Sequence, residues 1–133
     1  TGIGELAARS AIEYANDREV FGAPIGTHQA VSFPLTEAYA RMETARLMRK
    51  KAEWLFDRGE DCAYETNVAK ATAVDAGIET VKHAMQAFGG WGYATEYDVE
   101  RWWREINLTR LAPVTQQMAY NHIAREIGFP RSY

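Results

Sequence analysis

The sequence has one cysteine among its 133 residues and no long apolar run. A single thiol, Cys62, closes no internal disulfide and has no companion for a metal site, which favours a reducing compartment, so we expect a cytoplasmic protein. Neither an apolar stretch of about 18 residues nor a charged-then-apolar leader is present, so we expect no membrane span and no signal peptide. The chain begins at Thr1 without a methionine, which is typical of a fragment or a processed product.

Positive charge is not in surplus either. Fifteen Lys and Arg residues stand against 18 Asp and Glu residues, which gives a net charge of −3. This balance produces no field that attracts nucleic acid or an anionic membrane, so we expect neither as a partner. The histidines lie on separate segments, which does not predict a metal site. The clustered carboxylates and the basic run near residue 46 are typical of solvated turns and helix faces.

Apolar residues recur at steps of three and four over most of the chain, which is the helical pattern. The clearest stripe predicts a long helix over residues 61–88. A second long helix is expected after Thr27, its predicted N-cap residue, and Pro34 predicts either a kink in that helix or its start. Helices are also expected over residues 3–19 and over residues 113–127, with Pro113 at the first helical position.

The core is predicted from the same stripes. Their residues are Ile3, Leu6, Ala7, Ala11 and Tyr14; Val31, Leu35, Ala38, Met42, Ala45, Ala52 and Leu55; Ala71, Val74, Ile78, Val81, Met85 and Phe88; and Val114, Met118, Ala119, Ile123 and Ile127. No strand-length alternating run and no repeat is visible. The prediction is a single all-α domain over residues 1–133, built as an antiparallel four-helix bundle.

Three glycines stand among aromatic residues in the segment 86–93, directly after the clearest helical stripe. One glycine is enough to end a helix. Further glycines let a backbone approach a flat or phosphorylated group where a Cβ atom would clash. The segment therefore has two interpretations, a close backbone contact with a ligand or a tight turn that leads into a packed aromatic cluster.

Five short motifs follow one another in a specific order. Residues 18–29 read Arg-x-x-Phe-Gly-x-Pro-Ile followed by His-Gln, and Ala69-Lys70 precedes the Gln-x-x-Gly-Gly-x-Gly-Tyr turn at residues 86–93. Residues 96–105 supply a Glu-Tyr-x-x-Glu-Arg stretch, and residues 113–115 stand where a late Glu-Gly-Thr is expected. Together the motifs resemble the C-terminal helical domain of the acyl-CoA dehydrogenase family from end to end. The resemblance implies the third domain of a flavoprotein, whose N-terminal helical and middle β domains are absent from this chain.

The resemblance also implies FAD as the cofactor and names its contacts. The residues expected to face the FAD of a neighbouring subunit are Arg18, Phe21, Gln29, Gln86, Gly89 and Gly90, and those expected to face the FAD of their own subunit are Thr115 and Gln117. An arginine suits a pyrophosphate because it offers paired donors and a permanent charge. The other interpretation of Arg18 is a cation that stabilises a helix C-terminus.

The sequence departs from the family at Pro113-Val114. The family places there the glutamate that removes the α-proton of the acyl-CoA, and proline supplies neither a carboxylate nor an N–H group. We therefore predict no catalytic residue in this chain. Either a base lies upstream, on the first helix before Thr1, or the protein is a non-catalytic scaffold that completes a partner's FAD site.

The resemblance further implies an acyl-CoA substrate in the full-length protein, an electron-transfer flavoprotein as redox partner, and a homo-oligomer built from dimers. Trp91, Tyr93, Trp102 and Trp103 place four large aromatic residues close together in the sequence. A small bundle does not easily enclose all of them, so we expect part of this group in a contact between chains, with Trp102 and Trp103 as candidate anchors.

Overall fold

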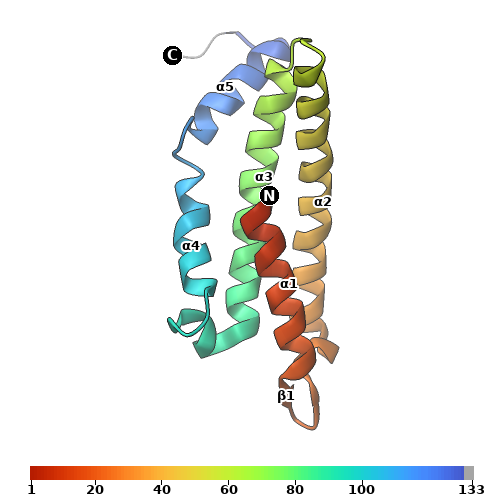
Figure 1. Ribbon diagram of the computed structural model, residues 1–133, viewed down its shortest axis with the longest axis vertical. Helices are drawn as coiled ribbons and strands as arrows, with labels where there is room; N and C mark the ends of the chain where they lie inside the picture. The colour runs from red at the N-terminus through yellow and green to blue at the C-terminus, as the bar shows by residue number, and fades with distance from the viewer. Residues whose placement is uncertain (131–133) are drawn as a thin grey trace.

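The computed structural model describes residues 1–130, which are mostly helical (Figure 1). The expected domain extends to residue 133, and residues 131–133 lie outside the described part. The helices are α1 (Gly2–Asp17), α2 (Gln29–Asp57), α3 (Ala63–Phe88), α4 (Val99–Leu108) and α5 (Gln116–Glu126). Short elements join them, namely the antiparallel strands β1 (Glu19–Val20) and β2 (Ala23–Pro24) and the 3₁₀ turns η1 (Ile25–Thr27) and η2 (Gly89–Tyr93).

The helices α1, α2 and α3 alternate in direction, and α4 and α5 follow one another along α3 in the fourth position of the bundle (Figure 1). The predicted all-α antiparallel bundle is therefore confirmed, with α4 and α5 sharing its fourth position. The break lies at residues 109–115, around Pro113, which has no backbone N–H to continue a helical ladder. Among the described helices, none has the length and apolar character needed to cross a bilayer.

Two predicted helix boundaries are wrong. The N-cap of α2 is His28, and the Thr27 hydroxyl donates to the carbonyl of Pro24 at 2.7 Å instead of capping the helix. Pro34 lies inside α2, which excludes the alternative that the helix starts there. The N-cap of α5 is Thr115, whose hydroxyl accepts a hydrogen bond from the Met118 N–H at 3.3 Å, so Pro113 lies outside the helix.

The core is centred on α3, as its stripe predicts, with Val74, Val81 and Phe88 buried. The helices α1 and α3 approach closely at Gly4 and Gly77, where a Cβ atom on Gly4 would lie only 3.2 Å from the Cα of Gly77. Side chains larger than hydrogen at this crossing would push the two helices apart.

Three expectations about burial need correction. Trp102 is only 8% exposed and belongs to the core, so this candidate anchor is used inside the chain, whereas Trp103 is only partly buried against the core. In α5 the predicted stripe holds in part, because Ala119 is buried while Met118 and Ile127 are exposed and the polar Gln116 is buried. Leu6 of α1 is exposed as well.

Candidate functional site

Arg18 is fixed through its backbone and free at its side chain. It is the C-cap residue of α1, where its N–H donates to the carbonyl of Tyr14 at 2.8 Å and its own carbonyl accepts from the N–H of Ile25 at 2.8 Å. Within residues 1–130 its exposed guanidinium has neither a hydrogen-bond nor an ion-pair partner. The position fits both interpretations of Arg18, a helix-terminal cation and an unpaired donor available to an anion.

Phe21 is held in an unusual conformation and displayed to solvent. Its φ is +57° and that of Gly22 is +80°, so the two residues form the tight turn between β1 and β2 in which both φ angles are positive. The left-handed region costs a residue with a Cβ atom roughly 1–2 kcal/mol. Because Phe21 is 96% exposed, packing within this chain does not offset that cost. A strained, exposed aromatic residue is typical of a binding surface.

The three glycines of the turn after α3 serve different needs. Gly89 adopts a φ of +59°, and a Cβ atom on Gly92 would lie 2.8 Å from the carbonyl oxygen of Met85. The fold itself therefore requires these two glycines. Gly90 has no positive φ, and a Cβ atom there would meet nothing within 4 Å. No contact inside this chain explains the glycine at position 90.

The hairpin and the glycine turn meet at one end of the bundle, the lower end in Figure 1. They line a shared hollow of about 400 Å³. The predicted residues in its lining are Arg18, Phe21, Gln86, Gly89 and Gly90. The predicted convergence of two segments distant in sequence is thus confirmed for these five residues. Gln29, the exposed first residue of α2, does not line the hollow, although its neighbour His28 does.

An aromatic cluster borders this hollow. Tyr14 stacks on Phe88 with their ring centroids 4.2 Å apart, and Tyr97 lies 5.0 Å from Phe88 and 5.9 Å from Trp91. The second interpretation of the glycine turn, a lead into packed aromatics, therefore also holds. The sequence pattern assigned Tyr14 to the core and Tyr97 to a motif, but only the fold brings residues 14 and 97 together.

Thr115 and Gln117 lie elsewhere, at the start of α5, which is held beside Ala71 and Asp75 of α3. Between them, the buried Gln116 anchors α5, since its amide nitrogen donates to Asp75 at 2.8 Å and to the carbonyl of Ala71 at 3.2 Å. Tyr120 donates to the same Asp75 carboxylate at 3.0 Å. Burial, and then the hydrogen bond to Asp75, raise the pKa of Tyr120. The local sequence pattern does not predict this network.

Lys70 holds the connection between α4 and α5. Its ammonium donates to the carbonyl of Thr109 and, at 2.9 Å, to that of Ala112. These carbonyls follow the last turn of α4, where a cation is favourable. Burial lowers the pKa of Lys70. The Ala69-Lys70 motif thus has a structural use here, which is to fix the turn that leads to Thr115.

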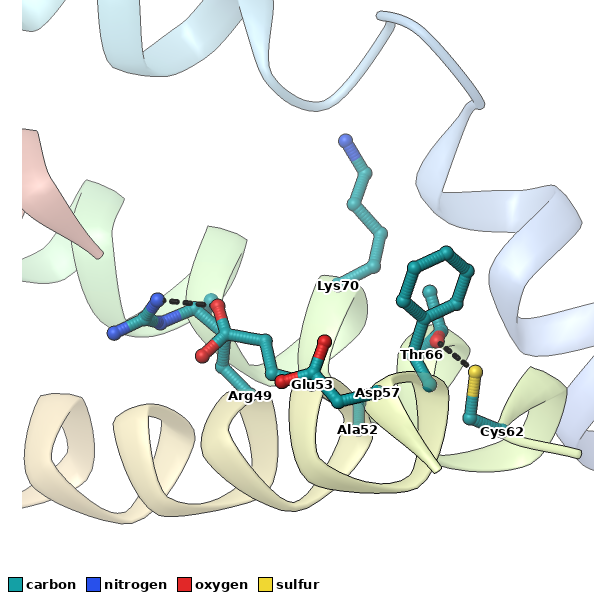
Figure 2. A pocket seen from close by; sticks show the side chains of 10 residues that line it. Arg49, Ala52, Glu53, Asp57, Cys62, Thr66 and Lys70 are labelled. Atoms are coloured by element: carbon teal, nitrogen blue, oxygen red, sulfur yellow. Dashed lines mark hydrogen bonds and ion pairs between the residues drawn. The ribbon is translucent and has the colours of Figure 1, made fainter. Parts of the chain in front are cut away.

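A second hollow of about 400 Å³ lies between α2 and α3, beside Lys70 (Figure 2). Some of its polar side chains are paired, since one Arg49 nitrogen donates to Glu53 at 2.5 Å and the Thr66 hydroxyl lies 3.7 Å from the Cys62 sulfur, while the buried Nε of Arg49 has no partner in the described part of the chain. Figure 2 shows Lys70 extending away from the Arg49–Glu53 pair. Within residues 1–130 no group of three His, Cys, Asp or Glu side chains is placed to hold a metal ion. We assign no reaction to this hollow.

Comparison with known proteins identifies the domain. The model of the acyl-CoA dehydrogenase C-terminal domain family matches residues 1–128. The acyl-CoA dehydrogenase FadE12 of Mycobacterium tuberculosis is 38% identical over 135 residues, which cover 99% of this chain and 35% of that protein. Butyryl-CoA dehydrogenase from Megasphaera elsdenii has a TM-score of 0.92 at 31% identity, over 95% of this chain and 33% of that one. A chain in the FAD complex of PigA has a TM-score of 0.89 at 28% identity, over 94% of this chain and 33% of that one.

The fold and these matches define a helical domain of the kind found in flavoprotein oxidoreductases. The chain belongs to the acyl-CoA dehydrogenase family, as its C-terminal domain. It spans about a third of the length of the curated relatives that it matches.

Proposed function

We propose that this chain forms the rim of an FAD site in a longer, flavin-dependent acyl-CoA dehydrogenase. The observation that carries the proposal is the hollow in which Arg18 and Phe21 meet the turn at Gly89 and Gly90. The unpaired Arg18 guanidinium suits a pyrophosphate, and the exposed ring of Phe21 offers an apolar face to a flat group. The open backbone at Gly90 leaves room for the same ligand. Gln86 from α3 adds an amide group to the same hollow, and Gln29 at the start of α2 follows His28, which lines it.

The site residues form two groups that serve two cofactors in this proposal. The group around Arg18 faces the FAD of a neighbouring subunit, while Thr115 and Gln117 face the FAD of their own subunit. Their separation along the bundle supports this division, since the first group surrounds the turn after Phe88 while the second is held beside Ala71 and Asp75 of α3. Lys70 and Gln116 hold the second group in place from α3.

Bound FAD supplies the acceptor for the β-hydride when an acyl-CoA thioester is dehydrogenated between its α and β carbons. Removal of the α-proton needs a base, and Pro113 and Val114 provide none. Asp75, whose carboxylate lies beside α5, is already bonded to Gln116 and Tyr120. The proposal therefore places the base on an upstream part of the full-length protein.

A second candidate is a non-catalytic scaffold subunit that completes a partner's FAD site while its own acyl site is inactive. Pro113 favours it, because the residue removes the family's usual base from this position. Both candidates share the remaining proposals, namely a homo-oligomer such as a tetramer and a place in fatty acid metabolism in the cytoplasm. The enzyme alone also needs an acyl-CoA substrate and an electron-transfer flavoprotein that accepts its electrons.

The experiment uses the purified full-length protein with its flavin, mixed anaerobically with acyl-CoAs of several chain lengths. Bleaching of the flavin is expected for the enzyme, and Pro113→Glu with Val114→Gly should then leave the rate unchanged. For the scaffold, no bleaching is expected until this pair of substitutions is made. A full-length protein that contains no flavin would overturn both candidates.

A further inference from the structure

The connection between α4 and α5 is attached to α3 at both of its ends. Residues 109–115 form turns and bends that lead from the end of α4 to the N-cap of α5. At the first end, the Lys70 ammonium holds two of their carbonyl groups. At the second end, Asp75 accepts a hydrogen bond from Gln116. The two attachment points are about one and a half helical turns apart on α3.

Asp75 is the point at which three side chains of this region meet. One carboxylate oxygen, Oδ1, accepts from the Gln116 amide at 2.8 Å and lies 3.6 Å from a guanidinium nitrogen of Arg110. The other oxygen, Oδ2, accepts from the Tyr120 hydroxyl at 3.0 Å. The ion pair is about half exposed and adds little by itself, so the two hydrogen bonds to α5 carry the attachment. A carboxylate suits this place because it only accepts and offers two oxygens.

The burial of Gln116 makes the attachment specific. Gln116 is only 6% exposed, and a buried amide costs free energy unless it is hydrogen-bonded. Its amide nitrogen donates to Asp75 and, at 3.1 Å, to the Tyr120 hydroxyl, so the three side chains form one network. A shift of α5 along α3 would break these bonds and leave the amide unpaired. Thr115 and Gln117, which flank Gln116 in the sequence, are therefore fixed relative to α3.

We propose that Asp75 is a positioning residue for the flavin: it makes no contact with the cofactor and sets where Thr115 and Gln117 meet it. The inference rests on the proposed function, in which those two residues face the FAD of their own subunit. Side chains that bind a ligand must be held within about 0.5 Å of the productive geometry, and supporting residues provide this precision. Asp75 provides it from α3, the helix on which the core is centred.

The test uses the full-length protein, purified with its flavin, and measures the dissociation constant of FAD. Asp75→Ala removes the acceptor for Gln116 and Tyr120, so FAD binding should weaken at least about tenfold. Asp75→Asn keeps the shape and one acceptor oxygen but loses the charge, and it should weaken binding at least about threefold. This second variant decides the case if Asp75→Ala does not fold.

Two control variants separate positioning from a general loss of stability. Glu79→Ala also removes a carboxylate from α3, about one turn beyond Asp75, but the partners of Glu79 are Lys82 and His83 on the same helix. Val81→Ala makes a cavity in the core, because Val81 is fully buried. Both variants should bind FAD like the wild type, although Val81→Ala should unfold at a lower urea concentration.

An exchange of donor and acceptor tests the hydrogen bond itself. Gln116→Glu places a second carboxylate against Asp75, where the amide nitrogen now lies at 2.8 Å, and the like charges should weaken FAD binding. Addition of Asp75→Asn returns a donor to the pair, with the amide now on α3. The double variant should therefore bind FAD at least about threefold more tightly than Gln116→Glu alone.

The possible failures are distinguishable. Asp75 variants that bind FAD as tightly as the wild type would overturn the inference and leave the proposed function intact. An equal loss of affinity in Val81→Ala, or a double variant no better than Gln116→Glu, would also overturn it, because Asp75 would then act through stability alone. A full-length wild type that holds no flavin would overturn the proposed function itself.

Discussion

At the scale of single residues, Gly90 and Gly92 differ in the space around them, although both lie in the turn after α3. Gly90→Ala should leave the thermal stability of the chain unchanged, because the new methyl group meets no atom within 4 Å. The same substitution should weaken FAD binding by the full-length protein at least about tenfold, since the methyl group occupies the space proposed for the cofactor. Gly92→Ala is the control, because crowding against Met85 should cost about 1–3 kcal/mol of stability. Thermal melts and flavin titrations measure both effects, and loss of stability in Gly90→Ala would contradict the assignment.

Arg18 allows its two interpretations to be separated. Arg18→Lys keeps a cation at the C-terminus of α1 but loses the planar fork of donors, while Arg18→Gln loses both. If the side chain binds a pyrophosphate, both variants should lower FAD affinity in the full-length protein. Only Arg18→Gln should lower the stability of the chain, by about 0.3–1 kcal/mol. A lysine variant with full FAD affinity would favour the helix-terminal cation.

At the scale of elements, the attachment of α5 to α3 should depend on pH. The pKa of Tyr120 lies above its usual value of 10.0, so the folded chain holds this proton more tightly than the unfolded chain does. The resulting stability is fully present below pH 10 and is lost as the pH rises through the raised pKa. Urea unfolding above pH 10 should therefore show a steeper loss for the wild type than for Tyr120→Phe. Parallel curves for the two proteins would show that the Asp75–Tyr120 bond adds nothing.

The sequence predicted the buried side of a helix well where that side is apolar, and poorly where the buried side chains are polar. The α3 stripe is buried as predicted, because Val74, Val81 and Phe88 gain by leaving water whatever surrounds them. The buried side of α5 depends instead on Gln116, whose burial is tolerable only because Asp75, some forty residues away, accepts its hydrogen bond. A local pattern carries no information about such a distant acceptor.

The same limit applies to the candidate site. The motifs predicted that Arg18 and the glycine turn would meet, and they do. They did not predict that Gly90 alone among the three glycines lacks a reason within the chain, or that Phe21 takes up a left-handed conformation. Both facts depend on backbone angles and neighbours that arise only in the folded chain.

At the scale of the whole molecule, this chain supplies only the rim of the proposed FAD site. The isolated chain should bind FAD weakly or not at all, because the proposed isoalloxazine pocket belongs to other domains and the rim contacts face solvent. A flavin titration followed by fluorescence measures this directly. Purification of the isolated chain with one tightly bound flavin would contradict the proposal, since this domain would then hold the cofactor alone.

Trp102 and Trp54 have different roles, because one lies in the core and the other at the surface of the chain. Trp102 is nearly buried within one chain, so Trp102→Ala should destabilise folding by about 3–5 kcal/mol, as large-to-small substitutions in cores do. Trp54 of α2 is 56% exposed, so Trp54→Ala should leave the unfolding of the monomer nearly unchanged and act, at most, on association. Urea unfolding at low and high protein concentration separates the two effects, because only the loss of an intersubunit contact makes stability depend on concentration. If Trp102→Ala changed association without changing monomer stability, the tryptophan would be an interface residue after all, and its burial in the core would not explain its role.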